Sequence, residues 1–454
     1  MEDRTPTAEA TASLRALLAA QDLAGLRNLL PHQHPADAAA LIDGLEPRAA
    51  WSVLDLMPLD RQAEVFAYLD HEVQAALARA VSRSRLAAIV SQMNADDRAD
   101  MFNSLSEEQR EALLPALSQA EREDIRRLAA YEEGTAGAIM TSDYATLSAD
   151  MTATEALGTL RREAPEKETI YRAYVIDRDR RLIGSVRLID LILAAPQMRI
   201  ADIMEDNTLA VRVTDDQEFV AGQIAKYDVL ALPVVDEEGR LVGIVTHDDA
   251  SDVMQEEATE DFHKVGTVSG LTGSVREAGI AALYRARVLW LGALVFANIF
   301  SGAGIAAFET TIAAYTGLVF FLPLLIGSGG NAGAQTATLM VRALATGDVR
   351  LSDWWRMIGR EILVAGALGL TMALAVSPIG IFRAGTEIAL VVSAAMVLIV
   401  LVGSIVGVVL PFVLTRLKLD PATASAPLIT TIADATGVVI YFTIATAWLG
   451  LPGN

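Results

Sequence analysis

The chain has 454 residues, which is more than a single hydrophobic core holds, so two or more domains are expected. Residues 1–286 contain 28 of the 36 basic and 50 of the 57 acidic residues, a net charge of −22, whereas the remainder carries +1. The acidic front argues against nucleic acid and anionic lipid as its partners and favours cations. The absence of cysteine excludes disulfides and thiolate metal sites, and oxygen ligation of Mg²⁺ or Ca²⁺ remains open.

Residues 1–135 are predicted to form an acidic, all-α N-terminal domain. Segments 37–42 and 62–69 have the helical spacing of apolar residues, and Leu-Glu-Pro at 45–47 and Met-Pro-Leu-Asp at 57–60 supply turn signals between them. The first residues of the chain lack an apolar core, so no signal peptide is expected. We interpret the domain as a small superhelix of short antiparallel helices whose charge is mostly solvated surface.

The next segment contains an internal duplication. Tyr-Val-Ile-Asp at 174–177 recurs as Pro-Val-Val-Asp at 233–236, and each is followed by a glycine-containing strand and a helix. This arrangement resembles a tandem CBS pair, with repeat 1 at 136–200 and repeat 2 at 201–255. Such pairs either bind adenine nucleotides or are purely structural, so ATP at this pair is a hypothesis that rests on the resemblance of fold.

An acidic connecting (plug) helix is predicted at 247–280. Carboxylates recur along it at i, i+4 spacing, at Asp248, Asp252, Glu256 and Glu260. Like charges so placed destabilise a helix by about 0.2–0.5 kcal/mol per pair. One interpretation is a solvated acidic helix. The other is that divalent cations screen this surface against a second acidic surface at residues 94–100, which would couple the cytoplasmic cation level to the first membrane span.

Residues 285–454 are predicted to form a transmembrane domain with five helices. Four uncharged runs at 288–308, 310–341, 362–382 and 388–415, and a last segment containing Asp434, each exceed the ~18 residues of a membrane-span candidate. The segments on one side of the predicted spans contain eight basic residues, and those on the other side contain one. Because basic residues mark cytoplasmic segments, this difference predicts a cytoplasmic N-terminus and an external C-terminus. Runs of this length disfavour the alternative of five core helices in a soluble protein.

The second run contains four glycines in seven positions at 327–333, each of which weakens a helix by about 1 kcal/mol relative to alanine. One interpretation is an irregular backbone that lines water, with exposed carbonyls and the Asn331 amide oxygen facing a hard cation. The alternative is a surface of small residues for close helix packing. The sequence leaves both open.

Asp434 is the only charged side chain in the last 34 residues. A carboxylate at membrane depth costs several kcal/mol unless it faces water, a cation or a partner. Thr430 lies one turn before it and adds a hydroxyl to the same helix face. The alternative is a buried carboxylate paired with a basic residue that reaches in from a loop. We interpret Asp434 as lining a water-filled cation path.

These parts, in this order, resemble the MgtE family of magnesium channels and transporters. The most specific matches are Pro-Leu-Leu-Ile-Gly-Ser-Gly-Gly-Asn-Ala-Gly-Ala-Gln at 323–335, Arg-Ala-Leu-Ala-Thr-Gly-Asp at 342–348 and Ile-Ala-Asp-Ala-Thr-Gly at 432–437. The resemblance covers nearly the whole chain. It implies a non-enzymatic, multi-pass, homodimeric protein of the bacterial inner membrane, with an all-α superhelical domain, an α+β CBS pair, a plug helix and five spans.

In this resemblance Asp434 holds the permeating Mg²⁺, and Asn331, Gly327, Gly330 and Thr430 lie along the pore. A cytoplasmic Mg²⁺ sensor closes the pore as negative feedback. By this resemblance, the sensor residues of the family correspond in this chain to Glu64, Asp96, Asp100, Gly137, Glu218, Asp228, Asp249, Asp252, Glu257, Glu260 and Asp261. Mg²⁺ is thus both substrate and regulator.

Two departures from the family pattern bear on selectivity. Ala426 stands where some members have Asn near the ion, and Ala334 replaces a polar residue that is common after the glycines. A transporter of Mn²⁺, Co²⁺ or Zn²⁺ is one alternative, although a site with only oxygen ligands favours a harder ion. The other alternative is a membrane-anchored nucleotide sensor, which would need neither Asp434 nor the glycines.

Overall fold

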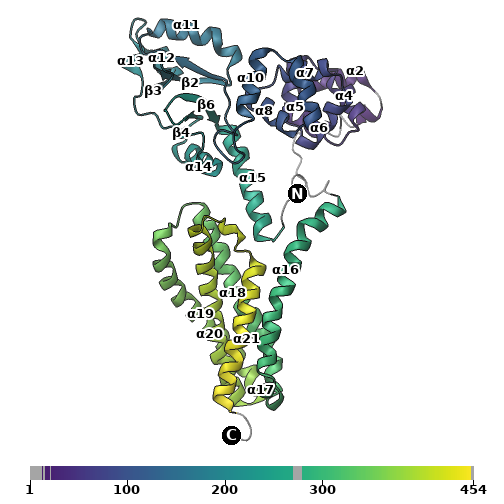
Figure 1. The fold of residues 1–454 in the computed structure, drawn as a ribbon, viewed down its shortest axis with the longest axis vertical. Helices are drawn as coiled ribbons and strands as arrows, with labels where there is room; N and C mark the ends of the chain where they lie inside the picture. Colours follow the sequence, from purple (N-terminus) through teal and green to yellow (C-terminus); the bar gives the residue numbers. More distant parts are fainter. Residues whose placement is uncertain (1–12, 14–15, 21, 269–278, 451–454) are drawn as a thin grey trace. The chain divides into compact units, whose positions relative to one another are not determined.

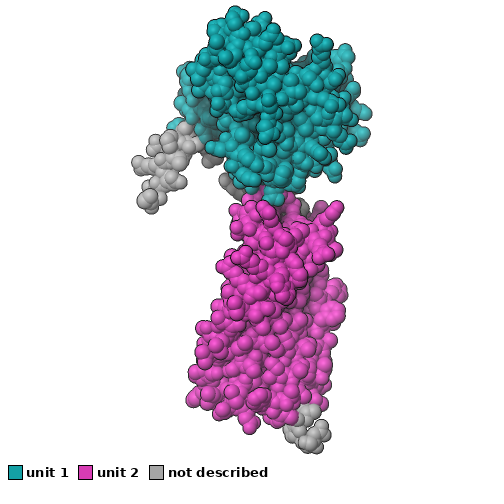
Figure 2. Space-filling model, turned by 90° about the vertical axis from the view of Figure 1, so that its left-hand side faces the viewer, with its two compact units in different colours: residues 1–256 teal, residues 257–454 magenta. Residues whose placement is uncertain are grey.

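The computed structural model describes residues 13, 16–20, 22–268 and 279–450. The chain forms two compact units, Met1–Glu256 and Glu257–Asn454, which are coloured separately in Figure 2. Unit 1 consists of a helical part followed by two small sheets, and unit 2 is helical.

The helical part of unit 1 consists of short helices connected by tight turns, as the sequence predicts (Figure 1). They are α2 (Leu23–Leu29), η1 (Leu30–His32), α3 (Pro35–Ile42), α4 (Pro47–Leu54), α5 (Leu59–Ala67), α6 (His71–Ala80), α7 (Arg83–Val90), α8 (Ala95–Ser104), α9 (Glu107–Leu113), η2 (Leu114–Ala116) and α10 (Gln119–Leu128). Ser106 and Ser118 start α9 and α10 with capping boxes, which satisfy backbone N–H groups at the helix ends. The apolar faces meet in one core, where the Trp51 and Phe66 rings stack.

The two repeats form two three-stranded sheets of identical order. They are β1 (Tyr144–Leu147), β2 (Thr169–Ile176) and β3 (Leu182–Arg187), then β4 (Val211–Arg212), β5 (Ala231–Val235) and β6 (Leu241–Thr246). In each sheet the first strand pairs parallel with the second, and the second antiparallel with the third. Tyr174 pairs with Ser185, and Pro233 pairs with Ile244, so both hairpins share one register at an offset of 59 residues. The predicted duplication is confirmed.

Helices cover these sheets and connect them. They are α11 (Ala153–Glu163), η3 (Ala164–Glu166), α12 (Leu188–Leu193), α13 (Ile200–Ile203), α14 (Gln217–Tyr227) and α15 (His247–Val265). The acidic connecting helix α15 is shorter than predicted, because it ends at Val265 and Thr267 then adopts a positive φ of 57°. Residues 269–278 of the predicted helix lie outside the described residues.

Unit 2 contains α16 (Ile280–Ala307), α17 (Glu309–Ala314), α18 (Gly317–Ala345), η4 (Leu351–Asp353), α19 (Trp354–Ala384), α20 (Thr386–Arg416), η5 (Pro421–Thr423) and α21 (Ala426–Leu449). Within the described residues, five of these segments are long and apolar enough to cross a membrane, in agreement with the five predicted spans. The unit is built around α18, α20 and α21, whose buried residues include Met396 and Tyr441. The chain's first span, α16, buries few of its residues within unit 2.

The predicted break in the second span is wrong. Residues 317–345 form one continuous α-helix through Pro323 and all the glycines. The interruption lies earlier in the run, where α17 ends at Ala314 and the chain turns before Gly317. Tertiary packing overrides the weak helix propensity of glycine here.

Candidate ion path and regulatory surfaces

Asp434 lies in the third turn of α21 and is the most unusual side chain of unit 2. The residue is partly buried, and no hydrogen bond or ion pair to its carboxylate is found among the described residues. The alternative of a basic partner reaching in from a loop is therefore not supported by the part of the chain that the structure describes. A carboxylate without a partner at membrane depth is stable only if it faces water or a cation.

The helices α18 and α21 run antiparallel and meet near this carboxylate. At one end of their contact the Tyr441 hydroxyl donates to the Leu318 carbonyl at 3.0 Å, and at the other Gly330 packs against Thr430. A Cβ on Gly330 would lie 3.2 Å from Thr430 Cγ2. Because Asp434 lies one turn beyond Thr430, the antiparallel register brings it level with α18 near Gly327. The Thr430 hydroxyl donates to the Pro427 carbonyl at 2.9 Å.

The glycines of α18 serve close packing at three positions. A Cβ on Gly329 would lie 2.4 Å from Ile399, and a Cβ on Gly333 would lie 2.7 Å from the Gly403 carbonyl of α20. The expectation of an irregular backbone with freely exposed carbonyls at Gly327 and Gly330 is therefore wrong, since a continuous helix pairs its main-chain groups internally. The alternative of small residues that allow close helix contact is confirmed for Gly329, Gly330 and Gly333.

The opposite side of α18 is polar and exposed. Asn331, Gln335 and Thr338 follow one another at helical spacing, and all three are exposed in the single chain, as is Gly327. The Thr338 hydroxyl bonds back to the Ala334 carbonyl at 2.9 Å, whereas the Asn331 amide is open. A polar stripe on a membrane helix requires water or protein beside it, because lipid offers no hydrogen bonds.

An acidic cluster, defined here as Asp96, Asp97, Asp248, Asp249 and Glu168, brings α8, the start of α15 and the start of β2 together within unit 1. Burial, followed by the charge of Asp97, raises the pKa of Asp96. Burial and the charge of Asp249 raise the pKa of Asp97. Burial, followed by the charges of Asp96 and Asp249, raises the pKa of Glu168 to about 9. These carboxylates repel one another, so a cation among them would be stabilising.

The polar contacts of the acidic cluster are few. Asn94 donates to Glu168 Oε1 at 2.9 Å, and Thr246 donates to Asp249 Oδ2 at 2.5 Å. One oxygen of Asp96 and one of Glu168 are buried without a hydrogen-bond partner. Among the described residues, no three His, Asp or Glu side chains meet in a geometry that holds a metal ion. The predicted sensor therefore stays a prediction.

Other predicted sensor residues lie elsewhere. Glu64 is ion-paired with Arg61 at 2.5 Å, and Gly137 is buried against the Tyr131 ring. Glu218 and Asp228 occupy the two ends of α14, and Asp228 closes that helix in the left-handed region with φ 52°. Of these residues, Glu64 lies towards the acidic cluster, because its charge acts on the Tyr68 hydroxyl together with those of Asp97 and Asp248.

Asp100 on α8 and Asp252 on α15 adjoin the acidic cluster, because their charges help to raise the pKa of Asp97. The last three predicted sensor residues, Glu257, Glu260 and Asp261, lie in unit 2 at the end of α15. Lys264 Nζ lies 2.6 Å from Glu260 and 2.6 Å from Asp420, whose other oxygen accepts from the Ala422 N–H at 2.8 Å. Partial burial opposes the Lys264 charge, but these two carboxylates outweigh it and raise its pKa. Burial and the charge of Asp420 raise the pKa of Asp261. Lys264 thus ties the end of α15 to the segment that starts the Asp434 helix.

The CBS pair contains an open cleft of about 650 Å³ beside β2, α12 and the end of α14. Tyr171 and Tyr227 line it and are both largely exposed. Arg187 lies in its wall and forms a bidentate pair with Asp190 at 2.7 and 2.9 Å. Aromatic faces beside a guanidinium suit a stacked base with a phosphate chain.

The offset of 59 residues relates this cleft to the acidic cluster. Residues that lie 59 positions apart are equivalent in the two repeats. Tyr227 is thus equivalent to Glu168, Arg187 to Thr246 and Asp190 to Asp249. One of two equivalent positions is therefore an open cleft with an arginine, and the other is acidic and covered by α8. Glu168 was not predicted from the sequence, and this offset is the signal that finds it.

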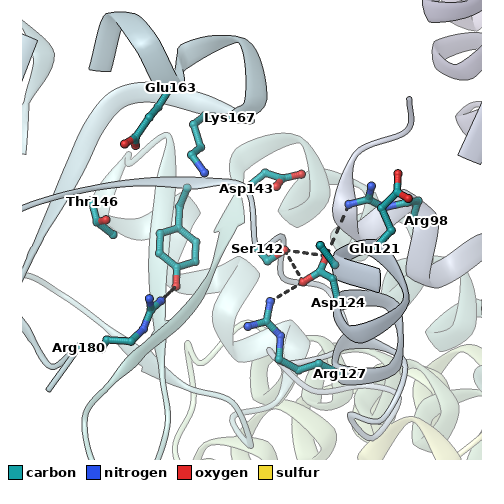
Figure 3. Close-up of a pocket in the computed structure, with 12 residues that line it drawn as sticks. Arg98, Glu121, Asp124, Arg127, Ser142, Asp143, Thr146, Glu163, Lys167 and Arg180 are labelled. Carbon is teal, nitrogen blue, oxygen red and sulfur yellow. Dashed lines mark hydrogen bonds and ion pairs between the residues drawn. The ribbon is translucent and has the colours of Figure 1, made fainter. Parts of the chain in front are cut away.

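A further cavity of about 400 Å³ lies between α10 and repeat 1 (Figure 3). Asp124 is its central residue: both carboxylate oxygens accept from the Ser142 hydroxyl, at 2.9 and 3.0 Å, and Asp124 pairs with Arg127 at 2.5 Å. Across the cavity Arg180 donates to the Tyr144 hydroxyl at 2.9 Å. The Ser142–Asp124 hydrogen bonds join the helical part to repeat 1.

Comparison with known proteins agrees with this arrangement. The chain matches the MgtE family, described as divalent cation transporters, at residues 322–444, the MgtE intracellular N domain at 33–134 and CBS domains at 136–196 and 200–256. It is 43% identical over 438 residues to the magnesium transporter MgtE of Thermus thermophilus, which covers 95% of this chain and 97% of that relative. It is 32% identical over 424 residues to the magnesium transporter MgtE of Bacillus subtilis, with coverage of 93% and 94%.

One solved structure is also similar. The crystal structure of the cytosolic domain of the Mg²⁺ channel MgtE in complex with ATP is 42% identical, with a TM-score of 0.51, and the match covers 54% of this chain and 99% of that one. Five membrane-length helices, which follow a helical domain and a CBS pair along the chain, define a multi-pass membrane transporter. The chain belongs to the MgtE family of divalent cation transporters. The predicted fold class is confirmed, and so is the expectation of a transporter rather than an enzyme.

Proposed function

We propose that this protein carries Mg²⁺ across the bacterial inner membrane and that Asp434 binds the passing ion. The observation that carries the proposal is a carboxylate without a protein partner, partly buried in a membrane-length helix. Relatives named magnesium transporters over nearly the full chain support the choice of ion. Mg²⁺ gives up its water reluctantly, so Asp434 is expected to hold it largely hydrated.

A second copy of the chain completes this path. The exposed stripe of Asn331, Gln335 and Thr338 and the open side of Asp434 are unsuited to lipid. Two chains that face each other through α18 and α21 would enclose these groups around water. Such a homodimer is closed by one two-fold axis, the commonest symmetry of soluble oligomers.

The N-terminus is proposed to be cytoplasmic and the C-terminus external. The basic residues Arg342, Arg350, Arg356, Arg416 and Lys418 all lie at the ends of the even-numbered spans, at the starts of the odd-numbered ones or between them. Arg383 lies at the opposite end, in the last turn of α19. An excess of basic residues marks cytoplasmic loops. Gene fusions of a reporter after residue 348 and after residue 385 test this, and an external reporter at 348 would overturn it.

Transport is tested by Mg²⁺ flux into proteoliposomes that contain the full chain. Asp434→Ala and Asp434→Asn are expected to abolish flux, whereas Glu309→Gln, which removes an exposed charge at the start of α17, leaves it unchanged. Flux that survives Asp434→Ala refutes the pore assignment. Adding Mn²⁺, Co²⁺ or Zn²⁺ as competitors tests selectivity, and a softer ion that outcompetes Mg²⁺ would overturn the assignment of Mg²⁺ as the main substrate.

Cytoplasmic Mg²⁺ is proposed to close the path as negative feedback. Cations that bind the acidic surfaces of α8 and α15 relieve their mutual repulsion and favour one arrangement of unit 1, as in any ligand-biased two-state switch. Lys264 and Asp420 pass a movement of α15 to the start of α21.

The sensor is tested by patch recordings of a variant neutralised at Asp249, Asp252, Glu257 and Glu260. Its channels are expected to stay open at high internal Mg²⁺. A matched variant neutralises four exposed acids on α9 and α10, at Glu107, Glu108, Glu111 and Glu123. The assignment is contradicted if channels of the first variant close at high internal Mg²⁺, or if channels of the second variant stay open under the same condition.

ATP is proposed to bind in the open cleft of the CBS pair. Tyr171 and Tyr227 offer faces for adenine, and Arg187 offers a partner for phosphate at the cost of its pair with Asp190. The similar cytosolic domain that was solved in complex with ATP supports the proposal. Calorimetry with ATP should show binding that Tyr171→Ala weakens at least fivefold, and equal affinity in that variant would overturn it.

A further inference from the structure

A cavity of about 480 Å³ lies in unit 2 between the start of α19 and the end of α20, apart from the ion path. Its walls are Ile358 and Trp354 of α19, and Val409 and Phe412 of α20. Its volume lies within the ~300–1,000 Å³ that is usual for ligand sites. One lining residue carries a charge, Arg416 at its rim.

The cavity lies where two spans meet the membrane surface. Helix α19 begins at Trp354 and α20 ends at Arg416, so the apolar walls extend inward from the ends of both helices. Trp354 and Trp355 are 48% and 72% exposed, and tryptophan at a span end marks the boundary between hydrocarbon and water. The floor of the cavity is therefore at acyl-chain depth, and Arg416 is at the depth of lipid headgroups.

Arg416 is unpaired within the described residues and exposed. The Ser352 hydroxyl lines the same rim, and Arg356 and Arg360 are exposed on the adjoining turns of α19. A guanidinium above an apolar cavity complements a molecule with an anionic head and a hydrocarbon tail. Unit 2 differs in this respect from the acidic unit 1, because its charged residues nearly balance.

We propose that this cavity binds one anionic phospholipid of the surrounding membrane, with its phosphate on Arg416 and one acyl chain between α19 and α20. Free phosphate would leave the apolar walls unfilled, and a zwitterionic lipid would leave the guanidinium without a net negative partner. Basic pockets between helices at the cytoplasmic surface are a known class of anionic-lipid site. The proposal does not depend on which ion the protein transports.

The test is native mass spectrometry of the full chain, released from nanodiscs that contain equal phosphatidylglycerol and phosphatidylcholine. The wild type is expected to retain phosphatidylglycerol preferentially. Arg416→Gln is expected to reduce this preference about fivefold, the effect of one basic residue at an anionic surface. Val409→Trp fills the cavity without changing charge and is expected to abolish retention of the lipid.

Lys418→Gln is the matched control, because Lys418 is exposed two residues further on and does not line the cavity. It is expected to change retention less than twofold. The proposal fails if Lys418→Gln equals Arg416→Gln, if Val409→Trp still retains the lipid, or if the wild type shows no preference. It also fails if Val409→Trp converts dimers to monomers, because the cavity would then be a subunit interface.

Discussion

Substitution of Gly403 by alanine tests the close contact between α18 and α20. A Cβ at this position would lie 2.3 Å from the Gly329 carbonyl oxygen, about 1.1 Å inside the ordinary contact limit of 3.4 Å. The obstructing atom is backbone, so a whole helix has to move. Overpacking of this kind costs about 1–3 kcal/mol, and alanine regains about 1 kcal/mol of helix propensity. Because backbone, rather than a flexible side chain, obstructs the methyl group, the upper part of the overpacking range applies, about 2–3 kcal/mol, and the net expectation is a loss of about 1–2 kcal/mol.

Thermal unfolding of the full chain in detergent, followed by size-exclusion of the remaining monodisperse protein, measures this loss. For a unit of this size we expect the midpoint to fall by about 2–8 °C. Gly366→Ala on α19 is the control, because nothing lies within 4 Å of its added methyl group. This substitution therefore gains helix propensity without any cost of overpacking. A Gly403→Ala midpoint at or above that of the wild type, or an equal fall in Gly366→Ala, would refute the argument from packing.

Three further predictions concern Glu168 in unit 1, Lys264 between α15 and α21, and Asn331 on α18. Glu168 has a folded pKa of about 9, far above an ordinary carboxyl, so the folded state holds a proton that the unfolded chain releases and stability declines as pH rises from about 4 to 9. The amide-exchange protection of α8 should be the same in Glu168→Gln and in the wild type near pH 4. Towards pH 9 the protection in Glu168→Gln should increasingly exceed that of the wild type, whereas Glu163→Gln should behave like the wild type throughout. Lys264→Gln leaves Asp420 and Glu260 unneutralised, so closure should need at least twofold more or less internal Mg²⁺ in patch recordings, and an unchanged midpoint excludes coupling through this residue. Asn331→Ala should lower Mg²⁺ flux while leaving the thermal midpoint within about 1 °C, since its side chain is exposed, and unchanged flux removes Asn331 from the path.

The parts of the fold that repeat or that span a membrane were predictable from the sequence. The uncharged runs are far longer than the helices of a soluble protein need to be, which indicates membrane spans. The duplicated sequence pattern shows which residues of the two hairpins are equivalent, and both hairpins have the same register. The glycine-rich run misled because glycine has two physical uses, flexible backbone and close approach. Only the neighbouring surface decides between them, and here it is the backbone of Gly403 on a helix some 70 residues away.

The acidic cluster shows the same limit. Periodicity identified Asp248 and its neighbours on α15, and the acidic run at residues 94–100 identified Asp96. Glu168 carries no local signal, since it is one more surface-type residue before a strand. Its burial depends on the packing of α8 over repeat 1, a long-range contact that a single sequence does not encode locally.

The packing of α18 also explains why its polar side remains available. Gly329 and Gly333 let α20 approach on one face, and Gly330 lets α21 approach beside it, so the backbone of α18 lies directly against Ile399, Gly403 and Thr430. These contacts leave no room for a longer side chain at Gly329, Gly330 or Gly333. The exposed stripe that begins at Asn331 is then left facing away from the unit's own core. The glycines of α18 therefore act in packing this helix against α20 and α21, and they leave its polar side exposed.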